Sequence, residues 1–280
     1  MKSIPLSIVS FLKDWTPPAL QRMARRGSSK TRESIRFEGK FETWDEAASQ
    51  CIGYVDEVIL AKVLDATLKV KRGDAECERD SVLFDHIHYS WPALAALMWT
   101  AARNGGRLSV LDFGGALGSS YFQSKKFLRG LTAVCWSVVE QPHYVEAGRK
   151  LIQDDRLRFY GQVEECVQEQ SPNVILLSGV LQCIADPNAL LATLLSSGCD
   201  TVILDRTCYV NEGQEERISI QHVPISIYSA SYPCRFFVED YILATFEAAG
   251  YALVERFAAL DNLHPSATWK GHIFLRRGLG

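Results

Sequence analysis

In the second half of the chain, two patterns of apolar and polar positions alternate. Short apolar runs predict strands, and apolar residues that recur at helical spacing between them predict helices. A helix between consecutive strands returns the chain for parallel pairing, and strands buried on both faces are continuously apolar. The order therefore predicts an α/β fold with a mostly parallel sheet, helices on both faces and right-handed crossovers. The predicted strands are 108–113, 133–140, 157–160, 173–178 and 201–205, and the predicted helices are 119–128, 142–152 and 187–195.

The end of the chain departs from this alternation. A helix is predicted at 236–249, ending at Gly250, and strands are predicted at 252–257 and 272–276 with no helix between them. Two consecutive strands without a crossover helix pair as an antiparallel hairpin. We therefore expect a Rossmann-like sheet that is parallel except for a C-terminal antiparallel hairpin.

The residues before 106 divide into two further segments. Residues 1–35 contain a basic cluster, which we interpret as a solvated N-terminal arm or as a surface segment that contacts anionic lipid or an acidic substrate. Residues 36–105 have helical periodicity, with a capping box at Thr43 and Glu46, and are predicted to form a helical cap. Residues 106–280 are predicted to form the cofactor-binding domain, with a lid over the acceptor around 208–236.

Composition narrows the class of protein. The chain has 280 residues, of which 47% are hydrophobic and 22% charged, and its net charge of −3 shows no basic excess of the kind that binds nucleic acid. No apolar run reaches the roughly 20 residues that span a bilayer. The eight cysteines include no Cys-x-x-Cys pair. We interpret them as reduced thiols of a cytoplasmic protein, and we predict no metal site.

Residues 110–120 join a buried strand, a glycine-rich turn and the start of a helix, with the sequence Val-Leu-Asp-Phe-Gly-Gly-Ala-Leu-Gly-Ser-Ser. Glycine lets the backbone approach a ligand closely and adopt conformations that other residues avoid. In open α/β sheets, ligands bind at the carboxyl ends of the strands, where this turn is expected. We therefore expect the turn to hold a cofactor.

Two cofactor classes use a turn of this kind. Nicotinamide and flavin dinucleotides favour Gly-x-Gly-x-x-Gly, but Ala116 and Ser119 stand where the second and third glycines would be needed. Enzymes that use S-adenosylmethionine (SAM) commonly have an acidic residue followed by small residues at every second position. The residues that fit this second spacing are Asp112, Gly114, Ala116 and Gly118, with Gly115 as an additional glycine.

Further cofactor-binding candidates follow the next three strands. Glu140, with Gln141 after it, ends the second strand, where a carboxylate accepts hydrogen bonds from the ribose hydroxyls of either cofactor class. A solvated strand-end charge is the alternative for Glu140. Gln162 is a candidate to lie beside the adenine, and Ser178 is a candidate to line the methionine part.

The sequence also resembles a family of bacterial SAM-dependent methyltransferases, often encoded among genes for surface-polysaccharide or natural-product assembly. The resemblance covers roughly 37–257 and implies the class I Rossmann-like fold, SAM as methyl donor and S-adenosylhomocysteine (SAH) as product. It leaves the acceptor open. The segments that carry it are Phe-Glu-Thr-Trp-Asp-Glu-Ala at 41–47, Glu-Arg-Asp-Ser-Val-Leu-Phe at 78–84, Tyr-Ser-Trp-Pro at 89–92, Leu-Asp-Phe-Gly-Gly-Ala-Leu-Gly-Ser-Ser-Tyr-Phe-Gln at 111–123, Trp-Ser-Val-Val-Glu-Gln-Pro at 136–142, Gln-His-Val-Pro at 221–224 and Ile-Tyr-Ser-Ala-Ser-Tyr-Pro-Cys at 227–234.

Four residues are candidates for the transfer step. His222 follows the fifth strand and could take the acceptor's proton, or it is a structural histidine. Asp205 is a second candidate base or an orienting group, and Arg206 a candidate to hold an anionic acceptor. A plain ion pair between Asp205 and Arg206 is the alternative. Tyr232 lies in an aromatic segment, which we interpret as one wall of the acceptor site or as aromatic residues that only pack against the protein.

Two charged groups lie upstream of the sheet. Residues 78–80 are Glu-Arg-Asp, which a solvated helix face would explain as well as a role over the cofactor. His86 and His88 have a spacing that metals tolerate on strands, but the sequence offers no third ligand.

The leading hypothesis is a SAM-dependent methyltransferase that methylates an oxygen of a small-molecule, sugar or glycan acceptor. The fourth strand ends in Ser-Gly-Val at 178–180 and lacks the Asn/Asp-Pro-Pro-aromatic run of adenine, cytosine or glutamine N-methylation. An NAD(P)-dependent oxidoreductase and a non-catalytic SAM-fold scaffold are the alternatives. The sequence leaves the oligomeric state open, a homodimer included.

Overall fold

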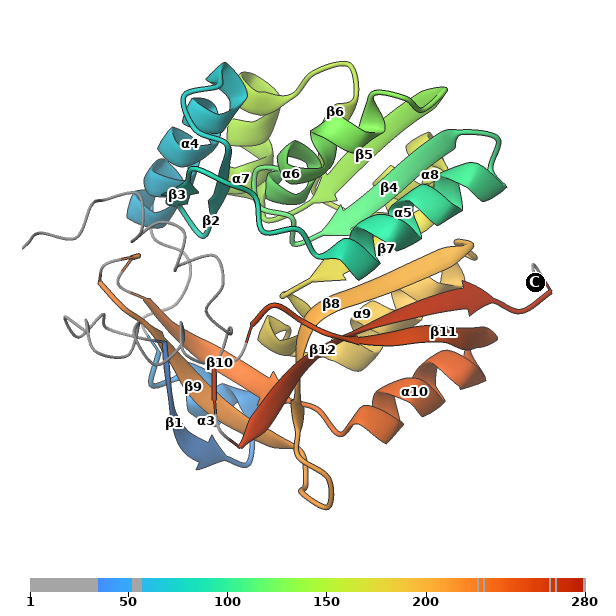
Figure 1. Ribbon diagram of the computed structural model, residues 1–280. Helices are drawn as coiled ribbons and strands as arrows, with labels where there is room; N and C mark the ends of the chain where they lie inside the picture. The colour runs from blue at the N-terminus through green and yellow to red at the C-terminus, as the bar shows by residue number, and fades with distance from the viewer. Residues whose placement is uncertain are drawn as a thin grey trace, which may run out of the picture. The chain divides into compact units, whose positions relative to one another are not determined.

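A seven-stranded sheet forms the centre of the computed structural model, which describes residues 35–51, 57–225, 227–228, 230–261, 263–264 and 266–278. The strand order is β11-β12-β8-β7-β4-β5-β6 (Figure 1). β4 to β8 are parallel, whereas β12 runs antiparallel to both β8 and β11. This confirms the predicted α/β class and the C-terminal antiparallel hairpin. The strands are β4 (Arg107–Phe113), β5 (Ala133–Val139), β6 (Leu157–Tyr160), β7 (Val174–Ser178), β8 (Thr201–Val210), β11 (Tyr251–Ala258) and β12 (Ala267–Arg276).

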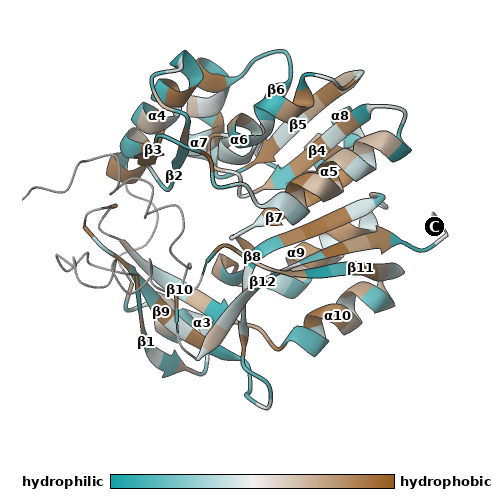
Figure 2. Cartoon of the chain, viewed as in Figure 1, coloured by the Kyte–Doolittle hydropathy of each residue, from teal (hydrophilic) through white to brown (hydrophobic). Residues whose placement is uncertain are grey.

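Helices cover both faces of this sheet. Leu97 of α5, Tyr121 of α6 and Val145 of α7 belong to one hydrophobic cluster, and α8, α9 and α10 contribute to a second cluster on the other face. The strands between the clusters are strongly apolar, as the hydropathy colours of β5 and β8 show in Figure 2. The helices are α5 (Trp91–Arg103), α6 (Ser119–Leu128), α7 (Pro142–Ala147) with its π-helical continuation η1 (Gly148–Ile152), α8 (Val163–Gln170), α9 (Pro187–Ser196) and α10 (Glu239–Ala248).

A second, three-stranded antiparallel sheet consists of β1 (Arg36–Phe41), β9 (Arg217–Val223) and β10 (Ala230–Phe236), in the order β1-β9-β10. One face packs under the short helix α3 (Trp44–Ala48), where Ala47 contacts Ile218 and Ile220. The other face meets β8, with Cys234 Sγ 3.8 Å from Cys208 Sγ. The segment around 208–236, expected as a lid, is therefore built from the end of β8 and from β9 and β10.

The segment 36–105, expected as a helical cap, contains strands as well as helices. Besides α3, α4 (Glu57–Arg72) and α5, this segment contains β1 and a hairpin of β2 (Cys77–Arg79) and β3 (Val82–Phe84). β1 finds its partner, β9, far along the chain, so its local sequence gives no pairing signal. The hairpin depends on Asp80 and Ser81, which both have positive φ, 51° and 67°, an uncommon conformation for residues other than glycine.

Two other boundaries differ from the sequence prediction. The helix predicted from 236 begins at Glu239, because Phe236 is the last residue of β10 and is fully buried there. α8 was not predicted, and only Val163 and Cys166 of its eight residues are buried. Such a narrow apolar stripe gives little periodic signal.

The described residues belong to one compact unit that begins at Ile35. The basic arm predicted at 1–35 lies outside them apart from Ile35, so its contact with an anionic surface stays a prediction. Within the described residues, no helix has the length and apolar character needed to cross a membrane.

Candidate functional site

The glycine-rich turn lies at the carboxyl end of β4, where the sequence predicted it. Gly114, Ala116 and Gly118 have positive φ values of 70°, 50° and 92°. The backbone N–H of Gly114 donates to Val139 O of β5 over 2.9 Å, and that of Gly118 donates to Gly115 O over 2.9 Å. These bonds tie the turn to the neighbouring strand and set Gly118 as the N-cap of α6.

Two glycines of the turn are required by close contacts. A Cβ at Gly114 would lie 2.4 Å from Val180 Cγ2, and one at Gly115 would lie 2.6 Å from Asp112 Cγ. Gly115, which the SAM spacing does not demand, is thus needed because the Asp112 carboxyl lies directly beneath the turn. The backbone at this turn can pack tightly only because these side chains are missing.

Asp112 is a buried carboxyl, 1% exposed, at the end of β4. Its Oδ2 accepts a hydrogen bond of 2.9 Å from Trp136 Nε1 of β5. Burial raises the pKa of Asp112 to about 7; the bond from Trp136 opposes this shift and the nearby Glu140 adds to it. Asp112 therefore supports the turn from below, bonded to the fully buried Trp136.

Glu140 follows β5 and faces the turn. Its Oε2 accepts a bond of 2.6 Å from the Gln141 backbone N–H, and its backbone N–H donates to Tyr160 O over 3.0 Å. Burial raises the pKa of Glu140, while backbone hydrogen bonds from Gln141 and Ala116 oppose the shift. The structure therefore brings Glu140 against the turn at Ala116, and its role as a cofactor-binding carboxylate stays a prediction.

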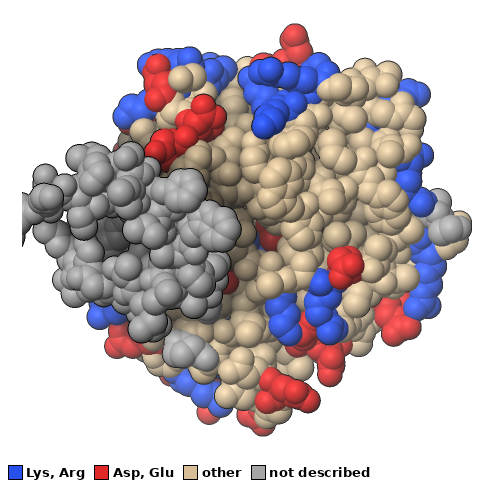
Figure 3. Space-filling view, viewed as in Figure 1, with Lys and Arg blue, Asp and Glu red and all other residues tan. Residues whose placement is uncertain are grey.

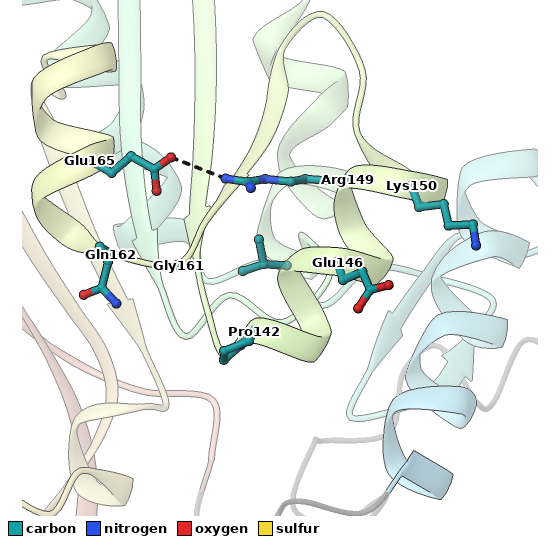
Figure 4. A pocket seen from close by; sticks show the side chains of 8 residues that line it. Pro142, Glu146, Arg149, Lys150, Gly161, Gln162 and Glu165 are labelled. Carbon is teal, nitrogen blue, oxygen red and sulfur yellow. Dashed lines mark ion pairs between the residues drawn. The ribbon is translucent and has the colours of Figure 1, made fainter.

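Gln162 is the N-cap residue of α8. It lines a groove of about 610 Å³ between α7 and α8, in which Arg149 Nη2 lies 3.6 Å from Glu165 Oε1 (Figure 4). The residues that line this groove do not include the turn or Glu140. The place of Gln162 beside an adenine stays a prediction.

Ser178 and Asp205 end the adjacent strands β7 and β8 and are paired in the sheet register. Ser178 Oγ donates to Asp205 Oδ2 over 3.3 Å. Asp205 is 4% exposed, and no described residue lies within hydrogen-bonding geometry of its Oδ1. Burial raises the pKa of Asp205; Arg206 opposes the shift, Asp261 adds to it, and hydrogen bonds from Ser178 and Ser90 oppose it.

Arg206 does not pair with its neighbour Asp205. Its Nε lies 2.5 Å from Asp261 Oδ2, and Arg79 Nη1 of β2 lies 3.8 Å from Asp261 Oδ1. Burial works against the charged guanidinium, but Asp261 and Asp80 raise the pKa of Arg206 above its ordinary value. The alternative of a plain Asp205–Arg206 pair is wrong, because Asp261, from the β11–β12 connection, supplies the partner.

Gln182 is a residue of this region that the sequence analysis missed. It lies in the 3-10 turn η2 (Leu181–Cys183), where its Nε2 donates to Gly179 O and Arg206 O, each over 3.1 Å. Gly179 and Arg206 have positive φ values of 72° and 56°. No local motif marks Gln182, since its partners are backbone carbonyls of two different segments.

Tyr232 and His222 lie on opposite faces of the small sheet. Tyr232 pairs with Gln221, whose Nε2 donates to the Tyr232 hydroxyl over 2.7 Å. Burial, followed by Cys183, Tyr228 and Asp80, raises the pKa of Tyr232 well above its ordinary value. The strand that carries Tyr232, β10, packs against η2. His222 is one residue further along β9, so it points to the other face, where its Nε2 lies 3.0 Å from Glu38 Oε2. The structure therefore does not bring His222 together with Asp205 and Tyr232.

The β2–β3 hairpin is attached to the start of α6 by Glu78. This side chain is 3% exposed, and it accepts hydrogen bonds from the Ser119 hydroxyl and, over 3.3 Å, from the Ser81 N–H. Burial raises the pKa of Glu78 to about 7, while the bond from Ser119 opposes the shift and Asp80 adds to it. The alternative of a solvated helix face at residues 78–80 is wrong for Glu78, since it is a buried strand residue.

His86 and His88 lie close together, with their Nε2 atoms 2.7 Å apart and His86 Nδ1 2.5 Å from Asp85 Oδ1. Both line a cavity of about 300 Å³ behind the hairpin. Among the described residues, no group of three or more potential metal ligands is found. The pair thus has no third protein ligand within the described part of the chain.

Together, these contacts place a cofactor-type turn beside a cluster of acidic and basic groups. The turn and Glu140 lie over β4 and β5, and Asp205, Arg206 and Gln182 lie over β7 and β8. Figure 3 shows acidic atoms in a hollow of the surface. The arrangement can hold a nucleotide-type ligand at one half and a polar second ligand at the other.

The comparisons with known proteins find similarity to solved structures, at low sequence identity. No family model matches the chain, and no curated protein matches it. Among solved structures, the N-terminal domain of EvdMO1, crystallised with SAH and D-fucose, is similar with a TM-score of 0.47 and 16% identity, over 75% of this chain and 94% of that one.

Two more solved structures are similar at the same level. Magnesium protoporphyrin IX methyltransferase from Synechocystis PCC 6803, with bound SAM, has a TM-score of 0.45 and 12% identity, over 77% of this chain and 96% of that one. The [4+2]-cyclase SpnF has a TM-score of 0.46 and 12% identity, over 88% of this chain and 99% of that one. These similarities assign no activity or ligand to this chain.

Replacing Gly115 with alanine should disturb the turn. The new Cβ would collide with the Asp112 carboxyl, so we expect Gly115→Ala to lower the free energy of unfolding by about 1–3 kcal/mol in urea denaturation. Gly130→Ala is the control, because its Cβ would meet nothing within 4 Å. Equal stability of the two variants would show that the turn does not rest on Asp112.

Replacing Glu78 with glutamine should change how stability depends on pH. The pKa of Glu78 is raised in the folded protein from 4.5 to about 7, so its contribution to stability is present at low pH and is lost as the pH rises through this window. The side chain of Glu78→Gln is neutral at every pH. Between about pH 5 and about pH 8, the free energy of unfolding of this variant should therefore rise relative to that of wild type, by up to about 3 kcal/mol.

The exposed Glu76, two residues earlier, gives the control Glu76→Gln. Thermal unfolding of the three proteins across this range measures the effect. A stability difference between Glu78→Gln and wild type that did not vary with pH would contradict the burial of an ionisable Glu78.

Proposed function

We propose that the protein is a SAM-dependent methyltransferase that transfers a methyl group to an oxygen of a small-molecule, sugar or glycan acceptor. One observation carries the proposal: the Glu140 carboxyl faces a tight glycine-rich turn at the carboxyl ends of β4 and β5. Ligands of open α/β sheets bind at this edge. The strand order, with β12 inserted between β11 and β8, is the layout of class I methyltransferases and supports the same cofactor.

The residues at this edge fit SAM. The turn keeps its backbone free of side chains at Gly114, Gly115 and Gly118, and the buried Asp112 holds it from below. Glu140 would accept hydrogen bonds from the ribose hydroxyls, with Gln141 and Ala116 beside it. Gln162 would lie beside the adenine, and Ser178 would line the methionine part.

The oxidoreductase alternative has less support. A dinucleotide turn would need glycine at 116 and 119, and Ser119 instead uses its hydroxyl to hold Glu78. The scaffold alternative gives no reason for a buried carboxyl such as Asp205, on β8, to keep one oxygen without a partner among the described residues. Both alternatives therefore explain fewer of the residues at the carboxyl ends of the strands than methyl transfer does.

When bound, SAM would supply an electrophilic methyl group on its sulfonium. Asp205 would accept the proton of the acceptor hydroxyl at Oδ1, while Ser178 holds its Oδ2. Arg206 lies next in the chain and lowers the pKa of Asp205, against the effect of burial. Asp261 fixes the Arg206 guanidinium, so the positive charge stays in place beside the base. Tyr232 would form one wall of the acceptor site.

Replacing Glu140 with glutamine tests the cofactor assignment. The amide loses the charge that strengthens bonds from the ribose hydroxyls, so we expect SAH affinity to fall about tenfold or more. Equilibrium dialysis with SAH measures this change. The exposed Glu255 of β11, the edge strand at the far end of the sheet from β5, gives the control Glu255→Gln. Unchanged affinity of Glu140→Gln would remove Glu140 from the ribose site.

Replacing Asp205 with asparagine tests the base. A base acts in its ionised form, so wild-type turnover should fall as the pH drops through the raised pKa of Asp205. Asp205→Asn should slow transfer by about 100-fold and lose this acid limb, with SAH affinity kept. A variant with wild-type turnover and the same pH profile would exclude Asp205 as the base.

A further inference from the structure

We propose that Gln182 and Asp205 together select the acceptor, by accepting hydrogen bonds from neighbouring hydroxyl groups of a neutral, saccharide-like substrate. This inference rests on the proposed function, because it places the acceptor over the ends of β7 and β8. It adds Gln182 to the site and narrows the substrate to a class rich in hydrogen-bond donors.

Both side chains present a buried oxygen that lacks a partner. Gln182 is 7% and Asp205 4% exposed, and no described residue hydrogen-bonds to Gln182 Oε1 or Asp205 Oδ1. The orientation of the Gln182 amide is fixed, because both partners of its nitrogen are carbonyl oxygens, Gly179 O and Arg206 O. The unpartnered atoms are therefore both hydrogen-bond acceptors.

Hydrogen bonds to the backbone tie together the two segments that carry these side chains. The Gly179 N–H donates to Asp205 O over 2.9 Å, and Gln182 Nε2 donates to the carbonyls of Gly179 and of Arg206, the residue after Asp205. Gly179 and Arg206 both have positive φ. For a residue with a side chain, such as Arg206, this backbone conformation persists only where the surrounding structure enforces it. Such residues cluster at functional sites.

The charges around the pair disfavour an anionic ligand. The Arg206 guanidinium binds Asp261, and Arg79 lies on the same carboxylate, so these cations are already engaged within the protein. A carboxylate or phosphate on the acceptor would instead meet Asp205 and Asp80. The expectation that Arg206 holds an anionic acceptor thus gives way to a substrate that donates hydrogen bonds.

Three sets of probes test this inference on the full chain saturated with SAH. Calorimetric titration with methyl hexopyranosides, hexosamines and hexose 6-phosphates compares neutral, cationic and anionic ligands that share a hexose ring. We expect the neutral glycosides to bind and to be methylated when SAM replaces SAH. Gln182→Met should weaken glycoside binding about tenfold, with SAH affinity unchanged.

The exposed Gln168 of α8 gives the control Gln168→Met, and Asp205→Asn gives a second test that keeps the side-chain volume. Asp205→Asn should also weaken glycoside binding. Binding of the phosphates or the hexosamines alone, or of no probe to the SAH-loaded protein, would overturn the inference. So would wild-type glycoside affinity in both site variants. A chain that fails to bind SAH would instead refute the proposed function itself.

Discussion

The close packing of a glycine-rich turn on a buried carboxyl is the contact on which the rest of the site depends. Asp112 lies beneath the turn, bonded to Trp136, and leaves no room for a side chain at Gly115. The glycine-rich turn also leads into α6 and holds Ala116 against Glu140. A carboxyl that is buried at this point costs free energy, which the bond from Trp136 offsets only in part.

The second half of the site is assembled by long-range contacts. Arg206 at the end of β8 is held by Asp261 from the β11–β12 connection, and Arg79 of the β2–β3 hairpin reaches the same carboxylate. Glu78, on the same hairpin, is fixed to Ser119 at the start of α6. The hairpin thus connects the start of α6, in the proposed cofactor half, to Asp261, in the proposed acceptor half. A displacement of the hairpin would change both halves together.

The sequence predicts the main sheet well, because its signals are local. Apolar runs, a proline at the start of α7 and the turn at 113–118 each mark an element by themselves. The same holds for Asp112 and Glu140, which lie where strand ends predicted them. By contrast, β1 pairs with β9 far away in the sequence, and the β2–β3 hairpin depends on two polar residues in a conformation that their types rarely adopt.

The acceptor half was harder to predict for the same physical reason. Asp205 and Arg206 are neighbours in sequence, which suggested an ion pair, but the partner of Arg206 comes from Asp261. His222 and Tyr232 lie in the same expected segment, yet strand alternation sends them to opposite faces of the small sheet. Gln182 has only backbone partners and carries no motif. Side-chain direction and distant partners decide these roles, and neither is encoded in local spacing.

Titration calorimetry of the wild-type protein with SAH, with NADH in parallel, tests the central claim most directly. The turn, Asp112 and Glu140 predict micromolar binding of SAH and no binding of NADH. Binding of NADH alone would contradict the claim and make the chain a dinucleotide-binding protein. Binding of neither would show that this edge of the sheet does not hold an adenosyl cofactor.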